Sequence, residues 1–189
     1  MNRMTNFMVK DTINKNRAKY GLAPIRNFGY HAGERSYNYL LFSQHLGNVD
    51  PDWTFKWSIG GYCFNDTFQY DEKAYEEMIS FVDSAQSPII FFTLGSCSSK
   101  DGNRFSKALV DICKKHDYRL IIGSGSAKTG ITLQADIHLF LMKQPVPHNL
   151  IFPHCDGVIH HGGCGTTHSV GRAGKPQLIT PLIIDQPYW

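Results

Sequence analysis

The sequence predicts an α/β fold over residues 71–189, in which a parallel sheet is flanked by helices. Short continuous apolar runs recur in this region and are typical of strands buried on both faces. Between the early runs lie segments whose apolar residues recur at helical spacing. Strands that alternate with helices build a parallel sheet with right-handed crossovers.

The first predicted helix starts after Asp71 and Glu72, because acidic side chains stabilise a helix N-terminus. Its apolar residues follow at helical spacing: Tyr75, Met78, Ile79 and Val82. Residues 89–94 form the first apolar run and predict a buried strand. The second helix is marked by Phe105, Ala108, Leu109, Ile112 and Cys113. Four more strands are predicted at residues 118–122, 137–141, 157–160 and 177–180. This order is that of a Rossmann-like layer, in which ligands bind at the carboxyl ends of the strands.

Residues 1–70 differ in composition and periodicity: they are rich in aromatic residues, and glycines interrupt any long hydrophobic period. Residues 1–20 are polar and predict a surface helix, with a transit peptide as the alternative. Residues 37–42 fit either a strand or a buried helix turn, and periodicity alone does not decide. We therefore expect two parts, residues 1–70 and residues 71–189.

Composition narrows the range of ligands and locations. Hydrophobic residues make up 42% and charged residues 19% of the 189 residues, as in folded soluble proteins. The net charge of +3 is spread along the chain, which predicts no nucleic-acid partner but suits an anionic ligand such as a diphosphate. Five cysteines without a disulfide-framework spacing, and no signal peptide, predict a reducing, cytoplasmic location. The longest apolar run, residues 88–94, is too short to cross a bilayer.

The segment most informative about chemistry follows the strand predicted at residues 157–160. It reads HHGGCGTT over residues 160–167, and a helix is expected to begin near Thr166. Glycines let the backbone approach a ligand closely, and Thr166 or a neighbour would cap the helix. The first amides of such a helix attract an anion, so a glycine-rich loop followed by a helix N-terminus is an arrangement that can bind a diphosphate without a metal. A glycine-rich turn without a ligand explains the glycine content equally well.

Three consecutive motifs carry a resemblance to a known family. They read HHGG-x-GTT, then x₄-RAGKPQ, then P-x₃-DQPYW, over about thirty residues. Together they resemble the donor-binding signature of UDP-glycosyltransferases with the GT-B fold, most closely the branch of sterol glucosyltransferases and macrolide glycosyltransferases. Upstream, residues 88–96 and 146–153 are similar to other segments of that donor domain. Before residue 88 the resemblance is weaker.

The resemblance implies a role for individual residues. It implies that the donor diphosphate contacts Ser96, His161, Gly163, Gly165, Thr166 and Thr167. Val146 and His148 would meet the uracil, and Asp185 with Gln186 would bind the sugar hydroxyls. Ser169 stands where many plant members have a ribose-binding glutamate, which leaves the ribose contact unassigned. From the residues alone, His161 fits a core histidine, His148 a surface-loop histidine, and Asp185 a turn cap.

The implied activity is transfer of a hexose, taken to be glucose, from UDP to a hydroxyl group with inversion. The implied acceptor is a small lipophilic molecule of sterol, lipid or polyketide type, and no metal cofactor is expected. We identify no catalytic residue, because the family's base lies near the start of the acceptor domain and His31 matches nothing. Residues 1–70 would be the end of that acceptor domain and the linker, and residues 71–189 a donor-binding domain cut short. The chain is therefore expected to be an enzyme fragment, or else a non-catalytic nucleotide-sugar-binding module whose partner chain supplies the acceptor domain.

Two other sites suggested by the residues are set aside. A zinc site would draw on His154, Cys155, His160, His161, Cys164 and His168. Their spacings match no common zinc pattern. Residues 123–130 imitate a phosphate-binding P-loop, but Ala127 stands where that motif needs glycine.

Overall fold

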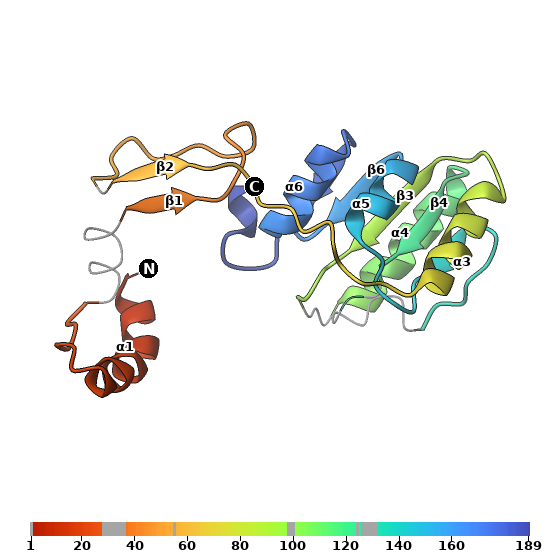
Figure 1. Cartoon of the computed structure of the whole chain (residues 1–189). Helices are drawn as coiled ribbons and strands as arrows, with labels where there is room; N and C mark the ends of the chain where they lie inside the picture. Colours follow the sequence, from red (N-terminus) through yellow and green to blue (C-terminus); the bar gives the residue numbers. More distant parts are fainter. Residues whose placement is uncertain (1, 28–36, 55, 98–100, 124, 126–131) are drawn as a thin grey trace. The chain divides into compact units, whose positions relative to one another are not determined.

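The computed structural model describes residues 2–27, 37–54, 56–97, 101–123, 125 and 132–189 (Figure 1). The chain forms two compact units, Met1–Tyr62 and Cys63–Trp189. The boundary between the units lies at residues 62–63, before the boundary predicted at residues 70–71. Residues 63–70 contact the rest of the second unit, since Asp66 forms an ion pair of 2.7 Å with Arg172. The guanidinium of Arg172 also lies over the ring of Phe64. His31 and most of the P-loop-like segment lie outside the described residues.

The first unit contains one long helix and a small sheet. The helix α1 (Asn2–Lys19) confirms the helix predicted at the start of the chain. The side chain of Asn14 accepts a hydrogen bond from the backbone N–H of Ile25 and donates one to its carbonyl, which fastens the following segment to the helix. Strands β1 (Asn38–Leu40) and β2 (Trp57–Ile59) pair in parallel. The alternative left open for residues 37–42 is thereby decided in favour of a strand.

The second unit is built on a five-stranded sheet in the order β5-β4-β3-β6-β7, and all its strand pairs are parallel. Its strands are β3 (Ile89–Thr93), β4 (Arg119–Ile122), β5 (Leu139–Leu141), β6 (Gly157–His160) and β7 (Gln177–Ile179). The predicted α/β fold is confirmed. The chain leaves β3 toward one side of the sheet and later returns to its other side through β6, so a topological switch point lies between these two strands.

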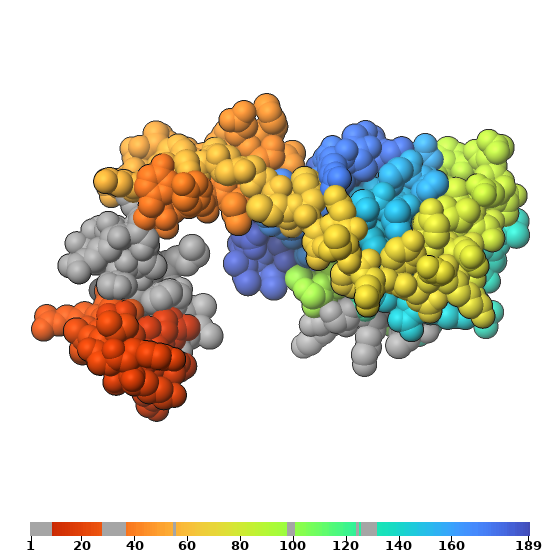
Figure 2. Space-filling view, in the orientation of Figure 1, coloured from red at the N-terminus to blue at the C-terminus, as the bar shows by residue number. Residues whose placement is uncertain are grey.

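Helices cover both faces of this sheet. One core cluster joins Phe91 and Val158 of the sheet to α3 (Glu72–Asp83), α5 (His148–Ile151), the 3₁₀ helix η1 (Phe152–His154) and α6 (Cys164–Arg172). The other cluster joins Phe92 and Leu120 to α4 (Gly102–Lys115). Successive strand residues point to opposite faces, so the doubly covered sheet explains the continuous apolar runs. Figure 2 shows α3, in yellow, beside the light blue segment that carries α5 and η1.

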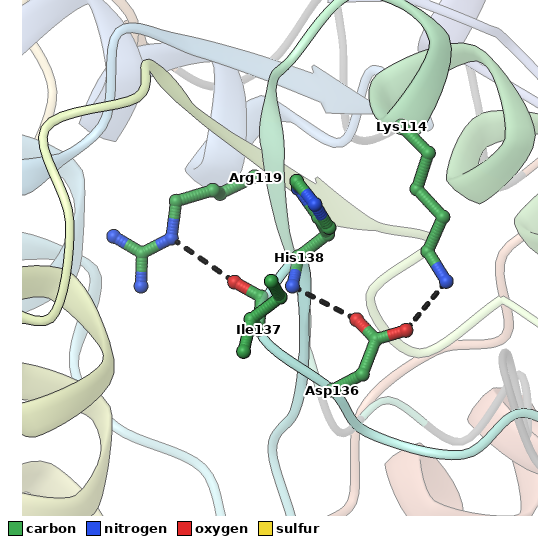
Figure 3. A network of polar contacts seen from close by, with 5 residues as sticks. All are labelled: Lys114, Arg119, Asp136, Ile137 and His138. Atoms are coloured by element: carbon green, nitrogen blue, oxygen red, sulfur yellow. Dashed lines mark hydrogen bonds and ion pairs between the residues drawn. The ribbon is translucent and has the colours of Figure 1, made fainter.

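The strand β5 is shorter than predicted and starts at Leu139 rather than at residue 137. The side chain of Ile137 is 78% exposed and lies before the strand. Asp136 holds this corner, because its carboxylate accepts hydrogen bonds from the backbone N–H of His138 (2.8 Å) and from Lys114 of α4 (2.5 Å) (Figure 3). Polar contacts of Asp136 thus form a turn at residues 136–138, where the apolar pattern predicted that the strand had already begun.

Arg119 is a buried charge at the start of β4, where an apolar strand was predicted. It is 1% exposed. Its guanidinium lies 3.9 Å from the centroid of the Phe81 ring. It donates hydrogen bonds to the Ser84 hydroxyl and to backbone carbonyls of Phe81, Val82, Ala85 and Ile137. Arg119 therefore satisfies carbonyls at the C-terminal end of α3 that would otherwise lack partners.

Across the part of the chain that the structure describes, no helix has the length and apolar character needed to cross a membrane.

Candidate functional site

A pocket of about 260 Å³ opens at the carboxyl edge of the second unit's sheet. Its lining comes from strand β3, from the loops after β3, β4 and β5, and from α5: Phe91, Thr93, Gly95, Ser96, Gly123, Gly125, Met142, Pro145, Val146, His148 and Ile151. Three residues assigned by resemblance, Ser96, Val146 and His148, therefore share one pocket. They come from segments that are fifty residues apart in the chain, and the parallel sheet brings them together.

The side chains that line this pocket differ in exposure. Val146 is 5% exposed and belongs to the core, whereas Ser96 is exposed on the loop after β3. The ring of His148 stacks on Phe152 at a centroid distance of 4.5 Å. Burial, assisted by the neighbouring His160 and His161, lowers the pKa of His148 to about 4. The pocket consequently presents a neutral imidazole beside apolar side chains such as Met142 and Val146 and the polar Ser96.

His161 connects this pocket to the glycine-rich loop after β6. It is 6% exposed, and its ring fits between two glycines. A Cβ on Gly95 would lie 2.6 Å from Cε1 of His161, and a Cβ on Gly163 would lie 2.5 Å from Nε2. The Nδ1 atom is buried without a hydrogen-bond partner in the described part of the chain. Burial lowers the pKa of His161, and the carboxylate of Asp185 opposes this shift.

The neighbouring His160 has a different, structural role. It is fully buried. Its Nδ1 accepts a hydrogen bond from the backbone N–H of Gly162 (3.0 Å), and its Nε2 is 2.8 Å from Oε1 of Gln177. Because Nδ1 accepts, Nε2 carries the proton and donates it to the glutamine. His160 thus holds the glycine-rich loop to β7, while His161 faces the loop after β3.

The helix α6 starts at Cys164, two residues before the predicted start at Thr166. Gly163 is its N-cap in extended conformation, and no side chain caps the helix. Thr166 therefore lies inside the first turn and does not cap the helix, and of the alternatives the nearby Gly163 takes the cap position without a side-chain hydrogen bond. The hydroxyl of Thr167 donates to the carbonyl of Gly163 at 3.1 Å, and both threonines are buried. The free groups of this turn are its first backbone amides, which is the arrangement that attracts an anion.

The predicted sugar-binding pair lies at the start of the 3₁₀ helix η2 (Gln186–Tyr188), with Asp185 as its N-cap residue and Gln186 as its first residue. Asp185 is exposed, and its carboxylate accepts a hydrogen bond of 3.0 Å from the indole N–H of Trp189. Gln186 is 5% exposed. Its side chain makes hydrogen bonds to its own loop and to Cys97. The contact with Cys97 has no counterpart in the sequence motifs, since no acid or histidine is patterned around this cysteine.

Within the described residues, no group of three or more histidine, cysteine or acidic side chains is placed to hold a metal ion. The ring nitrogens of His160 are engaged as described above. Cys155 is buried, with its thiol 3.5 Å from the carbonyl of Ile151. His168 contacts the carbonyl of Cys164 through Nδ1 at 2.7 Å. Cys155, His160 and His168 thus take part in the packing around β6 and α6.

Comparison with known proteins agrees with the signature in residues 160–189. No family model matches the chain. It is 28% identical to a sterol 3-beta-glucosyltransferase of Arabidopsis thaliana over 96% of this chain and 28% of the relative. It is 32% identical to a sterol 3-beta-glucosyltransferase of Candida albicans over 74% of this chain and 10% of the relative. The chain thus spans well under half of these relatives.

A solved structure of the glycotransferase of kitacinnamycin superposes with a TM-score of 0.66 at 17% identity. The match covers 95% of this chain and 44% of that one. This likeness confirms the Rossmann-like fold expected of a GT-B donor domain. The sequence matches confirm the resemblance to sterol glucosyltransferases.

Proposed function

We propose that this chain binds a UDP-sugar and supplies the donor site of a glycosyltransferase. The observation that carries the proposal is the contact between two motifs: the glycine-rich loop after β6, which contains His161, and the loop after β3, which contains Gly95 and Ser96. The ring of His161 lies against Gly95, and Gly95 lines the pocket that also holds Ser96, Val146 and His148. One nucleotide lying along the carboxyl edge of the sheet would place its base in the pocket and its diphosphate toward the first turn of α6.

In the proposed reaction, the hydroxyl oxygen of the acceptor bonds to the anomeric carbon of the sugar. The bond between that carbon and the diphosphate oxygen breaks, and UDP leaves with inversion at the carbon. The first amides of α6 and the ring of His161 would stabilise the charge on the departing diphosphate. The acceptor proton needs a base, and we assign none in this chain.

For the donor we propose UDP-glucose, and for the acceptor a small lipophilic alcohol of sterol, lipid or polyketide type. The support is the similarity to sterol 3-beta-glucosyltransferases. We further propose that donor binding needs no metal ion, since helix amides supply the positive end of the diphosphate site.

Titration calorimetry with UDP and UDP-glucose tests the donor site. Binding should weaken about tenfold or more in His161→Ala, because a hydrogen bond to a charged group contributes roughly 1.5–3 kcal/mol. His154→Ala is the matched control, since His154 is exposed and does not line the pocket. Excess EDTA should leave the affinity unchanged. Absence of binding by the native chain, or equal binding by both variants, would refute the assignment.

A transfer assay separates the enzyme from a binding module that needs a partner chain. The full chain is incubated with UDP-glucose and a sterol, and glucosylated sterol is measured. Product formation assigns the activity to this chain. Donor binding without product assigns to it the donor site alone.

A further inference from the structure

The buried side chain of Gln186 links its own loop to the loop after β3. Its Oε1 accepts hydrogen bonds from the backbone N–H groups of Leu182 (2.7 Å) and Ile183 (2.9 Å). Its Nε2 lies 3.1 Å from the thiol sulfur of Cys97, on the loop after β3, and donates to it. The two backbone donors identify the carbonyl end of the amide, so the orientation of the side chain is determined by its partners.

The backbone of Gln186 also packs against the glycine-rich loop after β6. A Cβ on Gly162 would lie 2.9 Å from the carbonyl oxygen of Gln186 and 3.3 Å from its Cβ. Gly162 has a φ of +83°, a conformation that glycine adopts without strain. Gln186 therefore contacts its own loop and the two loops that meet at His161.

The loop that Gln186 holds is strained. Ile184 has a φ of +56°, which is unfavourable for a β-branched residue, and its side chain is 86% exposed. No burial of this side chain offsets the strain. Such a conformation persists where surrounding contacts enforce it. Here the two residues before Ile184, Leu182 and Ile183, are both held by hydrogen bonds to Oε1 of Gln186. Asp185 then follows as the exposed member of the pair.

We infer that Gln186 positions residues 182–185, and that Cys97 is its partner in doing so. This inference rests on the proposed donor site. The carbonyl and one N–H of the Gln186 amide are engaged within the protein, so the second amide N–H and the exposed Asp185 are the groups of the pair that would face sugar hydroxyls. Gln186 acts on the donor through the position of Asp185 and through the packing of Gly162.

Amide hydrogen exchange tests the clamp without any ligand. Leu182 and Ile183 report on it directly, since both donate to Oε1 of Gln186. Their exchange should accelerate about tenfold or more in Gln186→Leu, which removes the acceptor. Cys97→Ala should accelerate it less, because only the third bond is lost. Cys97→Ser keeps a hydrogen-bond acceptor and should restore protection.

Cys63→Ala is the matched control, because Cys63 is an exposed cysteine of the same unit, distant in sequence from this loop. Its exchange at Leu182 and Ile183 should equal that of the native chain. Unchanged exchange in both Gln186→Leu and Cys97→Ala would overturn the clamp.

Calorimetry with UDP and UDP-glucose adds the functional readout. The clamp predicts that Cys97→Ala weakens UDP-glucose binding in the same direction as Gln186→Leu, and that the two changes are not additive in the double variant. A loss of UDP-glucose affinity confined to Gln186→Leu, with native affinity in Cys97→Ala, would instead make Gln186 a direct sugar contact. If the native chain binds neither ligand, the proposed donor site fails, while the exchange rates still decide whether the clamp exists.

Discussion

The imidazole of His161 lies directly over Gly95, leaving no room for a side chain: a Cβ there would stand 2.6 Å from Cε1. Gly95 also has a φ of +57°. Gly95→Ala should therefore displace His161 and weaken UDP binding about tenfold or more, measured by calorimetry. The positive φ should also lower the free energy of unfolding by about 1 kcal/mol.

Gly174→Ala separates these two effects. Gly174 has a φ of +66°, but no atom lies within 4 Å of the Cβ position. This variant should lose similar stability and keep the native affinity for UDP. Equal affinities in the two alanine variants would show that the contact with His161 does not position the donor site.

Lowering the pH should destabilise the folded chain already at pH values above those at which carboxylates titrate. Burial lowers the pKa of His148 to about 4 and lowers the pKa values of His160 and His161. Between pH 6.5 and 4 the unfolded chain therefore binds protons that the folded chain does not, so stability rises with pH. His148 alone should contribute about 1 kcal/mol per pH unit.

The matching variant is His148→Phe, which keeps a ring to stack on Phe152 and does not titrate. Chemical denaturation at several pH values should give a smaller slope for this variant than for the native chain. Identical slopes would show that His148 is protonated equally in the folded and unfolded chains.

Replacement of Arg119 should be costly although it carries no catalytic role. Arg119→Met keeps much of the volume but removes the donor to the carbonyls of Val82 and Ala85, whereas the Phe81 carbonyl keeps the N–H and hydroxyl of Ser84. A carbonyl that loses its partner on burial costs roughly 1–3 kcal/mol, so for these two part-buried carbonyls we expect a loss of about 2–4 kcal/mol in urea denaturation. Arg104→Met is the control, because the Arg104 side chain is 86% exposed and should change stability by less than about 0.5 kcal/mol. Equal effects would contradict the structural role.

Ile184→Gly should stabilise the folded chain, in contrast to most glycine substitutions. It relieves a positive φ that costs roughly 1–2 kcal/mol and removes a side chain that is 86% exposed. Part of the gain is lost to the greater entropy of the unfolded chain, which leaves about 0.5–1 kcal/mol. The measurement is the shift in thermal midpoint. Ile183→Gly, at a position without positive φ, should lower the midpoint, and a decrease in both variants would contradict the strain at Ile184.

The sheet of the second unit could be predicted well because its strands are covered on both faces. The strand at residues 157–160 was located to the residue, since an apolar run there ends at the glycines. The start of β5 was missed because an exposed Ile137 and a buried strand residue look the same in a sequence. Arg119 was not recognised as a core residue, because its partners are backbone carbonyls of a helix that lies 34 to 38 residues earlier.

A candidate site could be proposed from the motifs, but its contacts could not be predicted from them. Residues 160–167 and 185–186 indicated a ligand class, yet which of two adjacent histidines faces the loop after β3 depends on the hydrogen bonds of His160. The helix begins near Thr166, as predicted, but which residue caps it could not be predicted, because threonine favours the cap whereas the extended Gly163 occupies it. The contact between Gln186 and Cys97 joins residues 89 positions apart. No local pattern encodes such a contact.

The pairing of β3 with β6 has a consequence for how the molecule acquires its shape. These strands lie side by side, with Phe91 opposite Val158, although the whole of β4 and β5 separates them along the chain. Closing so long a loop is slow compared with forming the intervening helices. Since His161 follows one strand and Gly95 the other, the ability to hold a ligand arises only after this late pairing, and a bound nucleotide would favour the fully folded chain over every partly folded form.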